Sequence, residues 1–213
     1  MFKQHKFKII ISSVITALPM LFGIIVWNKL PEKIATHWGA NGQPDQYSSK
    51  LTAVILLPLI LLAVHLLCLF ATSFDKKNKE QNKKVFGLIF WLCPAVSLIA
   101  NGMTYVNALG TELNVINIAV LFMGVLFIVL GNYMPKCKHN FTIGFRIPTT
   151  LGSEENWNAT HRFAGKCFVI AGIILLPCIF LPQNLSVLTL FAIFPVALIP
   201  IIYSYWFESK RNK

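Results

Sequence analysis

Two stretches of the chain hold most of the side chains that could do chemistry. In the first, residues 30–50, His37 lies between two carboxylates, Glu32 and Asp45. Imidazole and carboxylate groups can ligate a divalent metal, but three ligands of mixed type without close spacing are weak grounds for a metal site. We therefore expect neither a metal nor a cofactor.

The first stretch also carries its own folding signals. Pro31 suits the first position of a short helix, and the pairs Asn41-Gly42 and Pro44-Asp45 are typical of turns. These signals predict a structured cap. A cap with exposed aromatic rings could bind a ligand, or it could simply be an interfacial loop. The candidate ligand-binding residues are His37, Trp38, Gly42, Asp45 and Tyr47.

The second stretch, residues 131–162, contains a predicted helix start. Ser153 is a good N-cap, and the two glutamates that follow it favour the positive end of a helix. On that helix Trp157 and His161 are four residues apart and share a face, whereas Arg162 is turned away. The helix is expected to continue into a long apolar segment.

Before this helix, Gly144 and Pro148 flank Arg146, which predicts a fixed turn that presents a guanidinium group. These residues either form a recognition surface or brace the loop, with Arg146 paired to Glu155. The candidate partner-binding or structural residues are Asn132, Tyr133, Pro135, Asn140, Gly144, Arg146, Pro148, Thr150, Glu155, Trp157, Thr160, His161 and Arg162.

An enzymatic role for His161 as a base is a less favoured interpretation, because no nucleophile lies at a readable spacing from it. We expect no catalytic residue. The alternative is a membrane-embedded enzyme that acts on a lipid or peptide at the cytoplasmic interface, where basic residues attract phosphate.

The elements that must position these stretches are apolar helices. Hydrophobic residues make up 55% of the chain and charged residues 13%, against about 25% charged in ordinary soluble domains. Six segments approach or exceed the roughly 20 helical residues that cross a bilayer. They are residues 7–27, 51–74, 85–107, 113–130, 163–181 and 185–207. The predicted fold is therefore an all-α, multi-pass membrane protein with six transmembrane helices.

Lysine and arginine in the connections predict the orientation. If the six helices alternate, sixteen of these residues lie on one side and three on the other. This bias places both termini in the cytoplasm. Residues 30–50 then lie outside and residues 131–162 inside. The predicted parts are a two-helix unit (1–74) and a four-helix unit (75–213), each carrying one of these connections.

Few ionisable side chains lie at membrane depth. His65 is the one ionisable side chain there, and it is expected to form a hydrogen bond with a neighbouring helix. This pattern disfavours a proton-coupled transporter. The five cysteines are scattered, without the spacing of a zinc site or a disulfide framework.

Both stretches resemble a known family. The motif around His37-Trp38, Gly42 and Pro44-Asp45 is similar to a domain of unknown function that opens many SdpI-type proteins. The second stretch resembles the SdpI family signature. It carries Gly131-Asn132-Tyr133-Met134-Pro135, Asn140, Gly144, Arg146, Pro148, Thr150-Leu151, Ser153-Glu154-Glu155, Trp157, Thr160-His161-Arg162 and Gly165. One departure is Thr149, where many relatives have tryptophan.

The resemblance implies a bacterial membrane protein that protects its cell from a secreted peptide toxin. It also implies that such a protein can sense the toxin and hold an ArsR-type autorepressor at the membrane. The implied partners are thus a peptide toxin outside, a repressor inside and membrane lipids around the chain, with no direct contact to nucleic acid.

Overall fold

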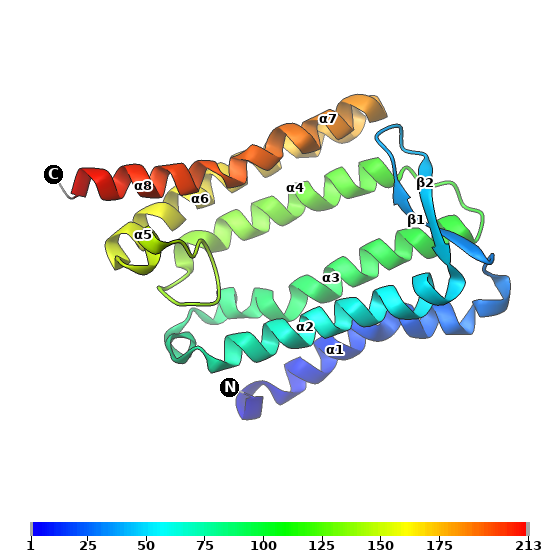
Figure 1. Cartoon of the computed structure of the whole chain (residues 1–213), viewed down its shortest axis with the longest axis horizontal. Coiled ribbons are helices and arrows are strands. Elements are labelled where there is room, and N and C mark those ends of the chain that lie inside the picture. The colour runs from blue at the N-terminus through cyan, green and yellow to red at the C-terminus, as the bar shows by residue number, and fades with distance from the viewer. Residues whose placement is uncertain (1, 212–213) are drawn as a thin grey trace. The chain divides into compact units, whose positions relative to one another are not determined.

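The computed structural model describes residues 2–211, most of them in helices (Figure 1). The α-helices are α1 (Phe2–Ile25), α2 (Leu57–Phe74), α3 (Lys83–Ala108), α4 (Val115–Tyr133), α5 (Pro148–Leu151), α6 (Glu154–Leu175), α7 (Gln183–Ile193) and α8 (Ile199–Arg211). Short 3-10 turns occupy Trp27–Lys29, Lys76–Glu80, Met134–Lys136, Leu176–Phe180 and Phe194–Ala197. A π-helical turn, Thr52–Leu56, precedes α2. The strands β1 (Lys33–Trp38) and β2 (Pro44–Ser49) form one hairpin.

The chain forms two compact units. The first contains Met1–Phe74 and Phe86–Val115, and the second contains Asp75–Val85 and Ile116–Lys213. Helix α3 therefore packs with α1 and α2, and α4 packs with the helices that follow it. The predicted division into a two-helix unit (1–74) and a four-helix unit (75–213) stays a prediction.

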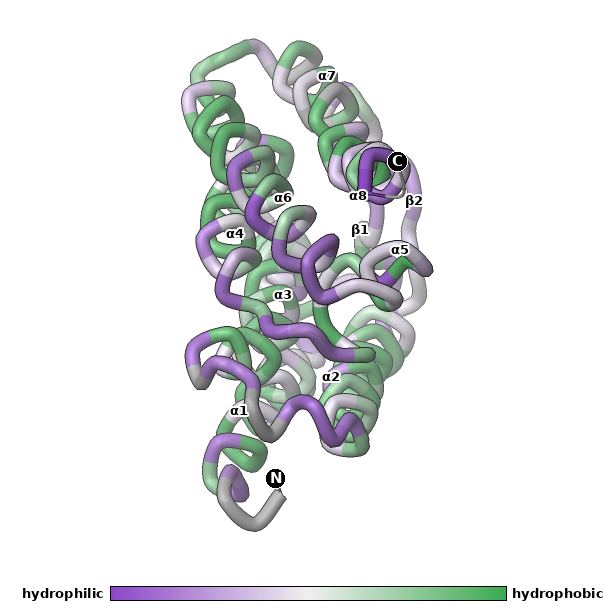
Figure 2. The backbone as a smooth tube through the Cα atoms, turned by 90° about the vertical axis from the view of Figure 1, so that its left-hand side faces the viewer, coloured by the Kyte–Doolittle hydropathy of each residue, from purple (hydrophilic) through white to green (hydrophobic). Residues whose placement is uncertain are grey.

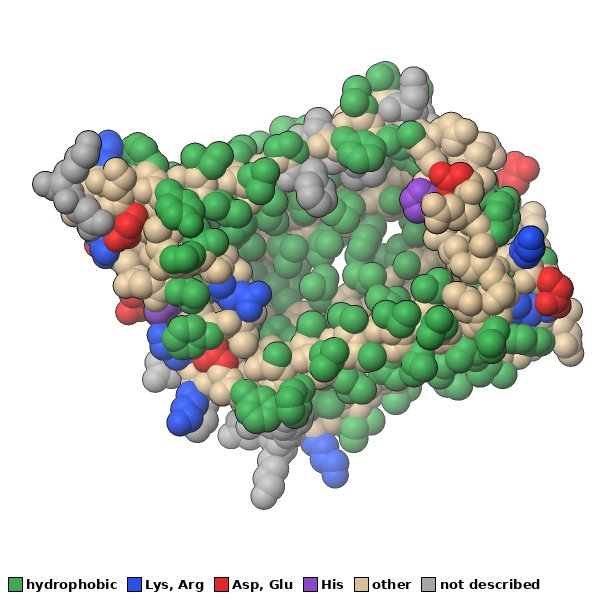
Figure 3. Space-filling view, in the orientation of Figure 1, with side chains coloured by type: hydrophobic (Ala, Val, Ile, Leu, Met, Phe, Trp, Pro, Cys, Tyr) green, Lys and Arg blue, Asp and Glu red, His purple; other side chains and the backbone are tan. Residues whose placement is uncertain are grey.

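Five helical segments are long and apolar enough to cross a membrane, with mean hydropathies of 1.8 to 2.9. They are His5–Ile25, Thr52–Phe74, Lys84–Ala108, Val115–Lys136 and Glu154–Phe180. Figure 2 shows hydrophobic residues along these helices and hydrophilic residues at many of their ends. Hydrophobic side chains also cover much of the face drawn in Figure 3. The first five predicted spans are thus confirmed as helices of suitable length and composition.

The sixth predicted span, residues 185–207, is not confirmed as one continuous helix. The 3-10 turn Phe194–Ala197 separates α7 from α8, and Pro195 lies within it. Proline has no backbone N–H to donate and its ring clashes with the preceding helical turn. This segment therefore consists of two short helices joined by a turn.

Residues 30–50 form an antiparallel hairpin, so the expected short helix at Pro31 is wrong. Ile34 pairs with Ser48 and Lys33 with Ser49, and the Thr36 and Ser48 hydroxyl oxygens lie 2.9 Å apart. β-Branched residues fit a pleated strand better than a helix, which explains the outcome at Ile34 and Thr36. Gly42 takes a φ of 75° in the turn, so the predicted turn chemistry is correct.

The hairpin is attached to its unit by apolar packing. Ile34 and Leu30 are buried with Val54 near the start of α2 and with Tyr105 of α3. Lys50, itself buried, donates a hydrogen bond of 2.9 Å from Nζ to Glu32 Oε1. The hairpin is therefore held in place by the helices of its own unit.

A chain of polar contacts joins the three helices of this unit. His65 Nε2 lies 3.0 Å from Ser12 Oγ, which confirms the predicted hydrogen bond to a neighbouring helix. Thr16 donates to the Ser12 carbonyl, and Ser97 of α3 donates to the Thr16 carbonyl. Such bonds between membrane helices contribute about 0.6 kcal/mol each on average.

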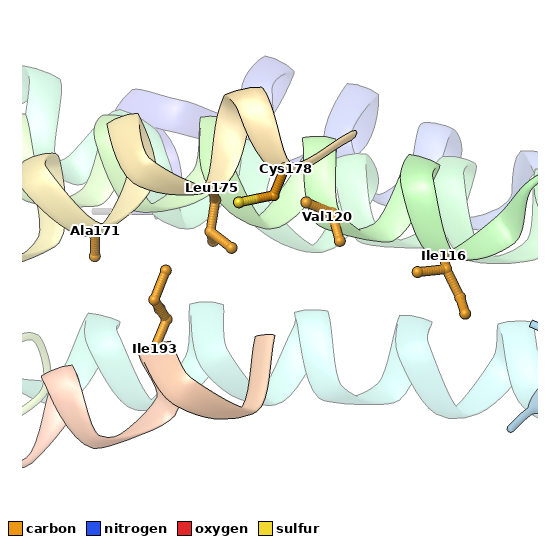
Figure 4. Packing of buried hydrophobic residues seen from close by; sticks show 6 residues of the cluster. All are labelled: Ile116, Val120, Ala171, Leu175, Cys178 and Ile193. Carbon is orange, nitrogen blue, oxygen red and sulfur yellow. The ribbon is translucent and has the colours of Figure 1, made fainter. Parts of the chain in front are cut away.

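In the second unit, α4 and α6 cross with almost no space between their backbones. A Cβ atom on Gly165 would lie 2.7 Å from the Gly131 carbonyl oxygen, and one on Gly172 would lie 2.5 Å from that of Gly124. The glycines of each helix are seven residues apart, so both pairs lie on one seam. Farther along, α4, α6, the 3-10 turn after α6 and α7 bury an apolar cluster (Figure 4). It comprises Ile116, Val120, Ala171, Leu175, Cys178 and Ile193.

Candidate functional site

The loop between α4 and α6, residues 134–153, is called the motif loop below. It is organised around the side chain of Asn140. This amide is completely buried, and its Nδ2 donates to the carbonyls of Lys138 and Ile143. Its Oδ1 accepts from the backbone N–H groups of Thr142 and Ile143. One side chain thus satisfies four backbone groups that no helix or sheet pairs, which keeps the loop in one conformation.

His161 of α6 fixes the turn at Gly144. Its Nε2 accepts a 3.1 Å hydrogen bond from the Phe145 N–H, and its Nδ1 lies 2.9 Å from the Trp157 carbonyl. Because a carbonyl only accepts, Nδ1 carries the proton and the ring is neutral. Both ring nitrogens are engaged in holding the backbone. Gly144 has a φ of 102°, which confirms the predicted fixed turn.

Trp157 lies beneath this turn, fully buried. Its ring stacks on His161 with centroids 4.1 Å apart, and its Nε1 donates to the Cys137 carbonyl at 2.8 Å. His139 meets the indole edge-on, at 5.0 Å between centroids. The predicted shared face of Trp157 and His161 is confirmed, and it braces the loop.

The Cys137 thiol lies inside this cluster, and burial raises its pKa to about 11. Because the thiolate is the reactive form, we predict that a soluble maleimide at pH 8 leaves Cys137 unmodified in the folded protein. Unfolding in denaturant should make it react within the same incubation time. Peptide mass mapping after a timed pulse measures this, and modification of Cys137 under native conditions would show that the loop opens.

The short helix α5 closes the loop at its far side. Pro148 occupies the first turn, where its missing N–H is not needed. The buried Thr150 Oγ1 accepts from the Ile147 N–H and lies within bonding distance of the carbonyls of Phe145 and Ile147. These contacts explain why Pro148 and Thr150 belong to the motif.

A connection to α8 was missed by the sequence analysis. The buried Asn156 donates from Nδ2 to the Ser204 carbonyl (3.0 Å) and to Glu208 Oε2 (2.9 Å). Its Oδ1 accepts from Thr160 and Ser204 hydroxyls. Ser153, confirmed as the N-cap by its bond from the Asn156 N–H, also accepts from Arg211 Nη1. The only sign of this connection in the sequence was that Asn156 lies among other polar residues of the motif.

Glu208 makes this connection sensitive to acid. Its bond from Asn156 and, next, its contacts with Arg211 lower the pKa of the carboxyl below the ordinary 4.5. The stability from this ionised group is therefore fully present above pH 4.5 and is lost as the pH falls through the lower folded-state value. We predict that Glu208→Gln flattens the decline of the melting temperature below pH 4.5. An equally steep decline in the variant would contradict the assignment.

Other motif residues are exposed at the surface of the loop. Arg146 donates to the Phe141 carbonyl at 3.2 Å, and Arg162 donates to the Asn158 carbonyl. Glu155 is exposed, and within the described chain no ion pair joins it to Arg146. Of the two alternatives, the brace by an Arg146–Glu155 pair is therefore wrong as to that pair, because His161 and Asn140 hold the loop instead.

Three motif residues lie at the end of α4. Asn132 and Pro135 are exposed, whereas Tyr133 packs partly buried against the Cys137 and Trp157 cluster. The Lys136 ammonium lies over the Tyr133 ring, 4.9 Å from its centroid. The Pro135 ring lies next to Gly165, where a side chain would collide with it.

The hairpin brings only part of its predicted set together. His37 Nδ1 and Asp45 Oδ1 are 2.6 Å apart and both side chains are about half exposed. Glu32 pairs with Lys50, so the three candidate metal ligands do not converge. Tyr47 is exposed and Trp38 is partly buried on the same hairpin. The hairpin therefore presents an exposed tyrosine ring and a hydrogen-bonded His37–Asp45 pair.

These features define a class: a multi-pass helical membrane protein with a β-hairpin on one unit and a hydrogen-bonded motif loop on the other. Residues 14–62 match the model of a domain of unknown function (DUF1648), and residues 136–204 match the SdpI/YfhL protein family. The chain is 31% identical to the immunity protein SdpI of Bacillus subtilis (strain 168) over 206 residues, 96% of this chain and 98% of that protein. The chain therefore belongs to the SdpI family. No solved structure matches it significantly.

Proposed function

We propose that this chain is a membrane immunity protein that protects a bacterial cell against a secreted peptide toxin. The observation that carries the proposal is the 31% identity to an immunity protein over nearly the full length of both chains. The order of the two matched regions, one on each compact unit, supports it further.

The proposed topology has six spans in the cell membrane, with the predicted segment 185–207, which runs from α7 into α8, forming the sixth. Both termini then lie in the cytoplasm, the hairpin outside and the motif loop inside, in accord with the distribution of lysine and arginine. A reporter that fluoresces only in the cytoplasm, fused in turn to each terminus, tests this. Fluorescence from both fusions fits six spans. Fluorescence from one alone fits five.

The toxin-contacting surface in this proposal is the hairpin, with His37, Trp38, Gly42, Asp45 and Tyr47. Tyr47 is 58% exposed; it pairs with Ala35 across the two strands and lies two residues after Asp45, which contacts His37. An exposed ring on a fixed support is suited to binding, because little side-chain freedom is lost on contact.

The decisive experiment is expression in a toxin-sensitive bacterium, followed by challenge with a peptide toxin of the SDP type. We expect survival at toxin concentrations that kill cells without the protein. Unchanged killing, with the protein found in the membrane fraction, would remove the proposal for this toxin.

Variants locate the surface. Tyr47→Ala should lower the highest toxin concentration that the cells survive about tenfold, as expected when an interfacial aromatic anchor is truncated. Glu112→Ala, an exposed change on the connection between α3 and α4, serves as the matched control and should protect like wild type. Equal protection by both variants would move the toxin site away from the hairpin.

The motif loop is proposed as a second surface, which holds a cytoplasmic partner such as an ArsR-type repressor. Phe141 is 55% exposed and its backbone carbonyl accepts from Arg146, so the rigid loop carries an exposed ring and an exposed arginine. Such pairs are enriched in protein interfaces. Co-purification of a repressor encoded nearby, lost in Arg146→Ala, tests this role separately from immunity.

The enzyme alternative has no support in the geometry. A base must accept a proton from its substrate, and His161 already uses both ring nitrogens on backbone groups. Glu155 and Arg146 are exposed, whereas His161 is 1% exposed.

A further inference from the structure

An open groove of roughly 790 Å³ lies on the second unit, beside the motif loop. Its walls come from the end of α4, from α6 and from α8. The side chains that decide its chemistry are Arg162, Lys166, Val169 and Ile170 of α6, and Tyr203 and Phe207 of α8. None of these residues belongs to the hairpin that is proposed to contact the toxin.

One face of α6 changes from positively charged to hydrophobic along the helix. Arg162 and Lys166 are four residues apart and exposed, and Val169 and Ile170 follow within the next turn. Within the described chain neither cation forms an ion pair, and the groove lining contains no carboxylate. The groove is therefore positive at one end and apolar at the other.

The opposite wall is aromatic and held in place. Tyr203 stacks on Phe163 with centroids 4.4 Å apart and ring planes at 18°, and Phe207 lies next to Tyr203. Tyrosine rings are typical of the level at which phospholipid headgroups meet the hydrocarbon. Both cations also belong to the helical segment Glu154–Phe180, which is apolar enough to span a membrane.

We propose that this groove binds an anionic phospholipid, with its phosphate between Arg162 and Lys166 and an acyl chain along Val169 and Ile170. Two unpaired cations match a phosphate with net negative charge, and the adjoining apolar wall matches the chain that a soluble phosphate lacks. An acidic protein segment would pair with the cations but would leave the apolar wall of Val169 and Ile170 without a hydrophobic partner.

The test is native mass spectrometry of the full-length protein, released from vesicles that contain equal amounts of phosphatidylglycerol and phosphatidylcholine. The wild type should retain phosphatidylglycerol preferentially. The double variant R162Q/K166Q should lower this preference about 25-fold, since each cation near the headgroups contributes about a fivefold effect. The matched control K76Q/K138Q removes two exposed lysines of the same unit and should retain the wild-type preference.

A third variant separates the wall from the charges. Ile170 is exposed, so Ile170→Ser should fold normally, and it should weaken retention of both lipids while leaving the preference unchanged. Equal retention of the two lipids by the wild type, or wild-type preference in R162Q/K166Q, would overturn the proposal. Displacement by soluble glycerol phosphate, with no effect of Ile170→Ser, would identify a phosphate site. Binding of an acidic peptide in place of lipid would identify a protein-docking surface.

Discussion

Gly144→Ala is expected to reduce the free energy of unfolding by about 3 kcal/mol, the largest effect of any methyl-sized change in the motif loop. The φ of 102° is unfavourable for alanine, and the added Cβ would lie 2.2 Å from His161 Nε2. The ring would have to move, and its bond from the Phe145 N–H would be lost. Thermal unfolding of the purified protein in detergent measures the loss.

Gly110→Ala is the matched control for this prediction. Gly110 also has a positive φ, 94°, but a Cβ there would meet nothing within 4 Å. Gly110→Ala should therefore lower the free energy of unfolding only through its unfavourable backbone conformation, by roughly 1 kcal/mol. Similar losses in the two variants would show that contact with His161 is unimportant.

A double-mutant cycle isolates that contact. His161→Ala removes the ring that the new methyl group would meet, so Gly144→Ala should cost less in the His161→Ala background than in wild type. The difference measures the coupling of the two residues. Equal costs in both backgrounds would contradict the geometry.

The second large effect is expected at the crossing of α4 and α6. Gly165→Ala would place a Cβ 2.7 Å from the Gly131 carbonyl oxygen and 2.8 Å from the Pro135 ring. Neither a helix backbone nor a proline ring can yield like a flexible side chain, so the helices must separate. We expect a loss of about 2 to 3 kcal/mol, as in other overpacked sites.

Because α6 carries Trp157 and His161, separation at Gly165 should also loosen the motif loop. Faster alkylation of Cys137 under native conditions would report this local change alongside the lower melting temperature. Gly102→Ala is the control, because it lies within α3 where a Cβ meets nothing within 4 Å. It should match or slightly exceed wild-type stability, as alanine favours helices. Wild-type behaviour of Gly165→Ala would mean that the close crossing is not needed.

Much of the helical framework could be predicted because the signals are local. Long apolar runs identify five segments, and the cap at Ser153 and the four-residue spacing of Trp157 and His161 depend only on neighbours along one helix. The hairpin was missed because Pro31 and the turn pairs suit either structure locally. The pairing of Ile34 with Ser48 decided between them.

The contacts that hold the site could not be predicted from spacing. Asn156 meets Ser204 and Glu208, about fifty residues away, and Asp75 accepts from the Phe141 N–H across a comparable separation. Nothing in the local sequence indicates such partners. The same limit explains why one of the two predicted alternatives paired Arg146 with Glu155, although a buried amide and an imidazole hold the loop.

The position that departs from the family pattern has an evolutionary consequence. Thr149 Oγ1 lies 2.7 Å from Ser204 Oγ, which itself donates to Asn156 Oδ1. An indole at this position could not make that hydroxyl contact, so we expect a tryptophan here to go with a different residue facing it from α8. Positions 149 and 204 should therefore coevolve, and transplanting the loop between relatives without its matching C-terminal helix should produce a chimera that folds poorly.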